Sequence, residues 1–247
     1  MNRVLMLIVL FVIPAIASAA VPPSMDLYQK LLTQYVKTEK HQGTTLNWVN
    51  YTALKKDAGF TQLVQQFAEY SPEQLKDKKE RLAFYINAYN ILAMKTVVDN
   101  WPVKSIKDVG SFLRPVWKKD AGIIGGKPVS LDEIENDVLR PMGEPRIHMA
   151  IVCASISCPD LRAEPYTAEK LDEQLDDQAK KFLSNPQKGL VIEGKKAKTS
   201  KIFDWFSEDF DKAYGSVRQF ISQYSDLPED IQLKPGGLSY NWSVNGE

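Results

Sequence analysis

The stretch RLAFYINAYNILAMKTVVDNW, residues 81–101, decides the fold because it is apolar on nearly every side. Between Leu82 and Val98 only a few polar side chains interrupt the apolar run. A helix with this composition must be buried on most of its sides, since no face is polar enough to meet water. The stretch therefore predicts a central helix around which the rest of the chain packs.

Two amides lie inside this run. Asn87 and Asn90 are three residues apart, so on a helix they occupy neighbouring positions of one face. A buried amide without partners costs about 1–3 kcal/mol, and each amide therefore needs a specific partner. Either the two amides hold the backbone of neighbouring loops or they line a site.

On the N-terminal side of the central helix, apolar residues at helical spacing predict one helix over 25–40 and another from Thr61. An extended piece with alternating residues lies between them, at 46–48. The sequence Ser-Pro-Glu-Gln at 71–74 is a capping box with proline at the first helical position, which predicts a helix start.

On the C-terminal side, short strands and helices alternate. The predicted elements are a hairpin turning at Gly125-Gly126, a helix from the capping box Ser130/Glu133 to Arg140, a buried strand at 147–152, a helix within 166–183, a hairpin near Gly194, a helix capped by Ser216 and Gln219, and a strand at 238–245 with one buried face. We interpret Trp48, Trp101, Trp205 and Trp242 as core aromatics. Together these elements predict an α+β fold: one mostly helical domain over 20–247, with a small sheet of short strands and hairpins.

The first 19 residues have the pattern of a secretory signal peptide. Arg3 precedes an apolar run that is too short to span a bilayer and ends in the small-residue motif Ala17-Ser18-Ala19. We expect cleavage after Ala19 and a soluble, exported protein, periplasmic or secreted, without a membrane anchor.

The charge of the chain is balanced. The chain carries 31 basic and 31 acidic residues, and loss of Arg3 with the signal peptide leaves a net charge of about −1. Short basic runs such as 195–198 are offset by acids elsewhere, so the sequence favours no nucleic-acid surface.

The stretch RIHMAIVCASISCP, residues 146–159, holds one of the two histidines and both cysteines of the chain. In an oxidising compartment, Cys153 and Cys158 are candidates for a disulfide that closes a short loop. Such a loop adds about 2 kcal/mol to the free energy of unfolding.

Alternatively, Cys158 is a nucleophile at the mouth of a loop before Pro159. Its thiol then needs a nearby base, and His148 is the buried candidate. Glu135 or one of the amides Asn87 and Asn90 would orient the imidazole, and the chemistry would be acyl transfer.

A metal site is the third interpretation. If 147–153 is a regular strand, His148 and Cys153 point to opposite faces, which makes a shared cation difficult. The other histidine, His41, lies at the polar end of the first predicted helix. No ligand spacing demands zinc, so we expect no metal and no cofactor.

Five separated blocks of the chain resemble one family. They are FYINAYNILAMKTVVDNWPVKSIKDV, GGKPVSLDEIENDVLR, PRIHMAIVCASISCPDLRAEPYTAEKLDEQLDDQAKKFL, SKIFDWFSEDF and YNWSVN. Over about residues 45–245 they are similar, in this order, to the bacterial and plant family called domain of unknown function 547. The resemblance implies a pattern of residues that the family shares. This pattern contains the Asn-Ala-Tyr-Asn block, which includes Tyr89, then His148 and Cys153, and the Ser-Cys-Pro block, which includes Cys158.

The chain departs from that pattern at two positions. Asn136 stands where a histidine often follows the Ile-Glu pair, and Asn241 stands where an aspartate usually precedes the final tryptophan.

Because the resemblance says little about activity, the functional hypotheses rest on residues 148–159. The first is a cysteine-dependent hydrolase or acyltransferase of the cell envelope, with Asn87, Tyr89 and Asn90 binding or orienting a small-molecule or peptide-like ligand. The second is a non-catalytic binding or scaffold protein with a structural disulfide. A metal-dependent enzyme is the third.

Overall fold

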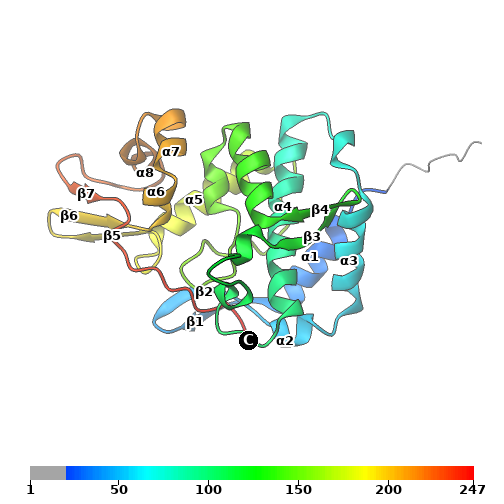
Figure 1. Ribbon diagram of the computed structural model, residues 1–247. Coiled ribbons are helices and arrows are strands. Elements are labelled where there is room, and N and C mark those ends of the chain that lie inside the picture. The colour runs from blue at the N-terminus through cyan, green and yellow to red at the C-terminus, as the bar shows by residue number, and fades with distance from the viewer. Residues whose placement is uncertain (1–20) are drawn as a thin grey trace, which may run out of the picture.

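The computed structural model describes residues 21–247, so the signal peptide predicted over 1–19 lies outside the described residues. Figure 1 shows a mostly helical chain with small sheets, which confirms the predicted α+β fold. The helices are α1 (Met25–Tyr35), α2 (Tyr51–Leu54), α3 (Ala58–Glu69), α4 (Lys78–Asp99), α5 (Leu171–Ser184), α6 (Ile202–Trp205), α7 (Ser207–Tyr214) and α8 (Val217–Tyr224). The strands are β1 (Val36–His41), β2 (Thr44–Val49), β3 (Asp120–Ile124), β4 (Lys127–Ser130), β5 (Leu190–Glu193), β6 (Lys196–Thr199) and β7 (Gln232–Lys234).

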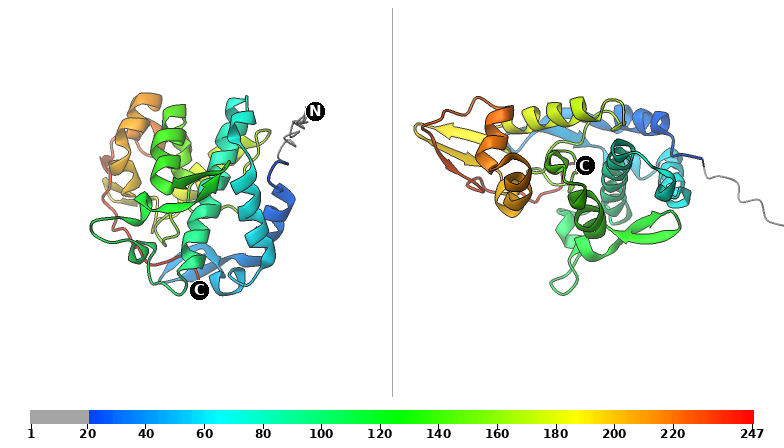
Figure 2. Two further views of the ribbon diagram at one scale, coloured as in Figure 1. Left: turned by 45° about the vertical axis from the view of Figure 1, so that its right-hand side comes forward. Right: turned by 90° about the horizontal axis from the view of Figure 1, so that it is seen from above.

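The central helix predicted from residues 82–98 is α4, and its side chains are buried along most of its length. The carboxylate of Asp77 starts it by accepting hydrogen bonds from the backbone N–H groups of Lys79 and Glu80. Figure 2 shows α1 and α3 on one side of α4, with the helical segment after β4 on the other. α4 therefore packs on several sides, as its composition requires.

The two predicted hairpins are present. β3 and β4 pair antiparallel around Gly125-Gly126, and β5 and β6 pair around Gly194. These glycines have positive φ, which such tight turns require. β7 adds a parallel partner to β6, and sequence periodicity did not indicate it.

The helix predicted over 25–40 is wrong beyond Tyr35. Val36 begins β1, which pairs antiparallel with β2. Val36 lies opposite Val49 at one end of the pair, and His41 lies opposite Thr44 at the other. The turn between the strands has Gln42 at φ 50° and Gly43 at φ 82°, the left-handed conformations of a two-residue hairpin. Pairing with β2 buries Val36, and this tertiary contact outweighs the helical spacing.

The capping box at 71–74 begins only a short 3₁₀ turn, Pro72–Gln74, in which the Ser71 side chain makes no capping hydrogen bond. The start signal that operates for α4 is Asp77. By contrast, the capping box of Ser130 and Glu133 is formed. It opens a π-helical segment, Glu133–Leu139, that continues into a 3₁₀ turn, Arg140–Met142.

The strands predicted at 147–152 and 238–245 are both wrong. The first is a 3₁₀ turn, Pro145–Met149, followed by irregular chain, because Pro145 and the Glu144 cap favour a helical start. The second is an irregular extended segment that binds a loop: the N–H of Ile156 donates to the carbonyl of Ser243 at 2.8 Å. The C-terminal segment makes only isolated bridges, Ser155 with Val244 and Val49 with Gly246, so its alternating residue types form no strand of a sheet.

The buried side chains form two hydrophobic cores. The first surrounds α4, and the second lies among α6, α7 and α8, with Phe203, Phe210 and Phe220 fully buried. The 3₁₀ turn joins the two cores, since Ile147 belongs to the first and Met149 to the second.

None of the four tryptophans predicted as core residues is fully buried, although Trp101 packs against the first core. Trp48, Trp101 and Trp242 are half-buried, and Trp205 is 46% exposed.

Candidate functional site

A pocket of about 220 Å³ lies where the two cores meet. Its polar lining consists of Asp132, Glu135, Asn136 and His148. Its aromatic lining consists of Tyr89, Trp117, Trp205, Phe206, Tyr240 and Trp242. Both cysteines also line it. The pocket thus brings together five of the predicted site residues, Cys153, Cys158, His148, Glu135 and Tyr89, from well-separated parts of the sequence.

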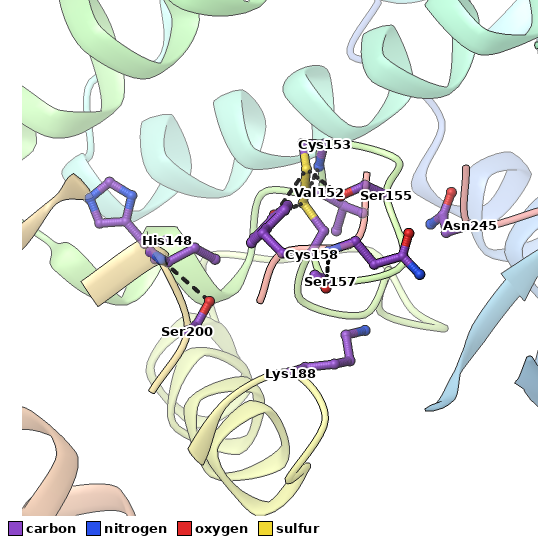
Figure 3. Close-up of a disulfide and its surroundings, with 12 residues drawn as sticks. His148, Val152, Cys153, Ser155, Ser157, Cys158, Lys188, Ser200 and Asn245 are labelled. Atoms are coloured by element: carbon purple, nitrogen blue, oxygen red, sulfur yellow. Dashed lines mark hydrogen bonds between the residues drawn. A yellow bond between two sulfur atoms is a disulfide. The ribbon is translucent and has the colours of Figure 1, made fainter. Parts of the chain in front are cut away.

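The sulfur atoms of Cys153 and Cys158 lie 2.14 Å apart, at disulfide distance. Figure 3 shows this pair in the loop before Pro159, with the imidazole of His148 directed away from it. Of the interpretations of Cys158, the pairing with Cys153 is therefore the one that the structure contains. No strand runs through 147–152, so His148 and Cys153 are not separated onto opposite faces of a sheet.

The disulfide is surrounded by hydroxyl groups. The Tyr240 hydroxyl lies 3.4 Å from each sulfur atom, and the Ser155 hydroxyl lies 3.1 Å from Sγ of Cys153. Cys158 is buried, whereas Cys153 is half-buried beside the pocket. The C-terminal segment therefore covers the disulfide and fixes the loop that carries it.

His148 is held by a carboxylate that the sequence hypotheses did not include. Its Nε2 lies 2.8 Å from Oδ2 of Asp209 on α7, and Phe206 stacks on its ring with 4.0 Å between centroids. Its Nδ1 lacks a hydrogen-bond partner and lies 3.8 Å from Oε1 of Glu135. Burial lowers the pKa of His148, although Asp209 acts in the opposite direction.

Asp209 also binds Arg140, whose Nε and Nη2 donate to its two carboxylate oxygens at 2.7 and 3.0 Å. Burial opposes ionisation of Asp209, but the hydrogen bonds with His148 and Arg140 hold its pKa well below the ordinary value. Sixty-one residues separate Asp209 from His148, so no local spacing could reveal the pair. The only sequence signal was the position of Asp209 in the quoted block SKIFDWFSEDF.

Glu135 lies on the π-helical segment and faces the same pocket. Burial raises its pKa to about 7, although the Arg140 guanidinium opposes this shift. The Tyr89 hydroxyl lies 3.5 Å from Oε2 of Glu135, and burial together with this carboxylate raises the pKa of Tyr89 well above its usual value. Glu135 therefore changes protonation near neutral pH inside a largely apolar pocket.

Asn87 and Asn90 hold loop backbone. Asn87 accepts from the N–H of Tyr166 at 3.0 Å and donates to its carbonyl at 2.8 Å. Asn90 accepts from the N–H of Val152 at 2.8 Å and donates to the carbonyl of Ala150 at 3.0 Å. Of the two interpretations of these amides, loop support is the one the structure shows.

The two positions that depart from the family pattern lie in different surroundings. Asn136 lines the pocket, where its side chain donates to Asp132 at 3.1 Å and accepts from Arg140 at 2.9 Å. Asn241 instead donates to Oε1 of Gln42 at 2.9 Å.

The aromatic wall comes from two segments far apart in sequence. Trp205 and Trp242 stack with centroids 5.8 Å apart, and Tyr240 lies 4.5 Å from Trp242. The ammonium group of Lys107 lies 4.7 Å from the centroid of a Trp242 ring, so this indole already accepts a cation.

Within residues 21–247, no group of three or more His, Cys, Asp or Glu side chains has an arrangement that could hold a metal ion. None of the helices in the same range has the length and apolar character that a membrane crossing requires.

Fold and site together define a class: mostly helical α+β proteins with a pocket that carries a disulfide, carboxylates and aromatic side chains. The model of the family described as "Protein of unknown function, DUF547" matches residues 72–183, which supports membership of the chain in that family. The matched region contains α4, Glu135, His148 and both cysteines, whereas Asp209 and the tryptophans 205 and 242 lie beyond it. No curated protein and no solved structure matches the chain.

Proposed function

We propose that the chain is an exported binding protein of the cell envelope whose pocket takes a small organic cation, with the disulfide between Cys153 and Cys158 as a structural lock. The composition of the pocket carries this proposal. Its lining contains the carboxylates of Asp132 and Glu135 and six aromatic side chains, and among the described residues no lysine or arginine lines it. Export is supported by the pattern of residues 1–19 and by the disulfide distance.

The aromatic side chains supply the apolar part of such a site. Ring faces attract ammonium groups through their quadrupole, most strongly for indole. Trp205 is 46% exposed and stacks on Trp242, so it presents aromatic surface that the core does not cover. An organic cation with methyl groups would bury both its charge and its apolar surface there.

The carboxylates supply the charge. Arg140 is the nearest guanidinium, but its hydrogen bonds go to Asp209 and to Asn136. Burial without a dedicated cation raises the pKa of Glu135 to about 7. A bound ammonium group would favour the ionised carboxylate, so the affinity should rise as the pH increases from 6 to 8.

A matched pair of probes tests the charge requirement. Choline and its uncharged carbon analogue 3,3-dimethylbutan-1-ol have nearly the same shape, and binding of each is measured by calorimetric titration at pH 8. We expect choline to bind at least about tenfold more tightly, because a desolvated cation–π contact contributes about 2 kcal/mol. Equal affinity for the two probes, no binding of choline, or preferential binding of a sugar would overturn the proposal.

Variants place the binding in the pocket. Glu135→Gln should weaken choline binding, whereas Asp137→Asn, an exposed position on the same helical segment, should leave it unchanged. Trp205→Ala should weaken choline binding. Trp48→Ala is the control and should leave it unchanged, because this indole stacks on His41 and does not line the pocket.

A cysteine-dependent hydrolase or acyltransferase is the second candidate, because Cys158, His148 and Glu135 line one pocket. This activity requires reduction of the disulfide, which would release the Cys158 thiol in the pocket that His148 also lines, and a rotation of the imidazole toward that thiol. In the reduced chain, fast alkylation of Cys158 that slows in His148→Ala would support it. Slow alkylation unchanged by that substitution would exclude it.

A further inference from the structure

The segment 104–119 carries the two most exposed large apolar side chains of the described chain. Phe112 is 99% exposed and Leu113 is 92% exposed, and they are adjacent. Single exposed apolar residues are ordinary on protein surfaces. Two adjacent large apolar side chains at almost full exposure are unusual, and packing within the chain does not explain them. In the right-hand view of Figure 2, the chain near these residues projects as a loop from the body.

Backbone hydrogen bonds present this pair at the tip of a defined turn. The N–H of Ser111 donates to the carbonyl of Arg114 at 2.9 Å, and the N–H of Arg114 donates to the Ser111 hydroxyl at 3.1 Å. At the base of the loop, a Cβ on Gly110 would lie 2.4 Å from the backbone nitrogen of Val116, so only glycine permits this closure. The tip is therefore held outward.

The base of the loop is anchored in the first core. Ile106 and Val116 on either side of it are buried, and the ammonium group of Lys119 donates to the carbonyl of Val109 at 2.9 Å. The turn thus stands on a fixed base while its apolar tip stays in solvent.

The same segment is strongly basic. Residues 104–119 contain Lys104, Lys107, Arg114, Lys118 and Lys119 against the single acid Asp108, which gives a net charge of +4 in a chain whose totals balance. An apolar tip surrounded by basic residues matches the order of a lipid surface, in which anionic headgroups lie above the acyl chains.

We propose that the loop 110–115 docks on an anionic lipid surface, with Phe112 and Leu113 entering the headgroup region and the exposed Lys104, Arg114 and Lys118 binding the headgroups. This is reversible surface docking rather than anchoring. It does not depend on the proposed ligand, although Trp117 of the same segment lines the pocket and would lie close to the membrane.

Vesicle co-sedimentation of the chain tests this proposal. Vesicles of equal parts phosphatidylglycerol and phosphatidylcholine are compared with vesicles of phosphatidylcholine alone, at low salt and at about 0.15 M, where the Debye length is about 8 Å. We expect at least about tenfold stronger partition onto the anionic vesicles at low salt and clear weakening at the higher salt. The double variant Phe112→Ser, Leu113→Ser should lose at least about tenfold in partition.

Ile123→Ser with Ile192→Ser is the matched control, because these side chains are 45% and 44% exposed at other places on the surface. This control should bind the vesicles as the original chain does, and the thermal midpoint of the loop variant should be unchanged. Absence of binding to anionic vesicles, equal binding by the loop variant, or sedimentation without vesicles through self-association would each overturn the proposal.

Discussion

The core around α4 and the smaller core among α6, α7 and α8 are buried to the same degree but are built differently. The first contains aliphatic side chains of one continuous helix, such as Ile86 and Leu92. The second is a cluster of phenylalanines, of which Phe203, Phe210 and Phe220 come from three different short helices. The part of the first core that α4 supplies is visible in a single stretch of sequence, whereas the phenylalanine cluster forms only when three short helices pack against one another.

The pocket lies on the boundary between these two cores, and His148 marks it. The 3₁₀ turn places Ile147 in one core and Met149 in the other, which leaves the imidazole between them. Asp209 from the second core then binds both His148 and Arg140. The polar side chains of His148, Asp209 and Arg140 therefore lie at the boundary between the two cores.

The largest expected effect comes from breaking the second core. Phe203→Ala removes a fully buried ring. The centroid of this ring lies 5.1 Å from that of Phe210 and 5.9 Å from that of Phe220. It should lower the free energy of unfolding by about 3–5 kcal/mol. Phe67→Ala in the first core is the matched change. Urea unfolding should show one transition for both variants, and an early separate transition in Phe203→Ala would mean that the cores unfold independently.

Glu135→Gln should have the next largest effect, as a gain in stability at high pH. The pKa of this carboxyl is raised from 4.5 to about 7 in the folded chain. Its stabilising contribution is therefore complete below about pH 4.5 and is lost as the pH rises through 7. At pH 8 the variant should be more stable by about 3–4 kcal/mol, since each pKa unit corresponds to about 1.4 kcal/mol.

Urea unfolding at pH 5 and pH 8 measures this difference, with Asp137→Asn as the control. A gain of the same size at both pH values would show that the charge of Glu135 is not its cause.

Loss of the disulfide should have a smaller effect. Cys153 and Cys158 are five residues apart, so the link closes a short loop. In the chain-entropy estimate, the variant Cys153→Ala, Cys158→Ala should be less stable by about 2 kcal/mol. Guanidinium unfolding without reductant measures the loss, and reductant should lower the original chain to a similar stability. A variant as stable as the oxidised chain would contradict the structural role.

The smallest effect is expected at the contact between the cores. Asp209→Asn weakens the hydrogen bonds to Arg140 and His148 and should cost about 1–2 kcal/mol at pH 6. Because Asp209 has a lowered pKa in the folded chain, its contribution is present above about 3.8 and is lost at lower pH. The difference in thermal midpoint should therefore narrow on acidification. Glu208→Gln, an exposed neighbour, should change little.

The sequence predicted those parts of the fold that depend on neighbouring residues. The central helix, the hairpins at Gly125-Gly126 and Gly194, and the Ser130–Glu133 capping box are determined within a few positions. The strands expected at 147–152 and 238–245 failed because a strand needs a partner.

The candidate site shows the same limit. His148, Cys153 and Cys158 are close in sequence, and their position beside one pocket could be anticipated. Asp209 could not, because it reaches His148 only through the folding of the second core. Trp205 was assigned to the core because residue type alone does not distinguish a buried indole from one at a pocket wall.

The most direct test of the account is a count of free thiols in the chain purified without reductant and denatured in guanidinium, so that the buried Cys158 can react. We predict no free thiol before reduction and two afterwards, because Cys153 and Cys158 are the only cysteines of the chain. Two free thiols before reduction would contradict a structural disulfide between Cys153 and Cys158 and would favour the cysteine-dependent enzyme.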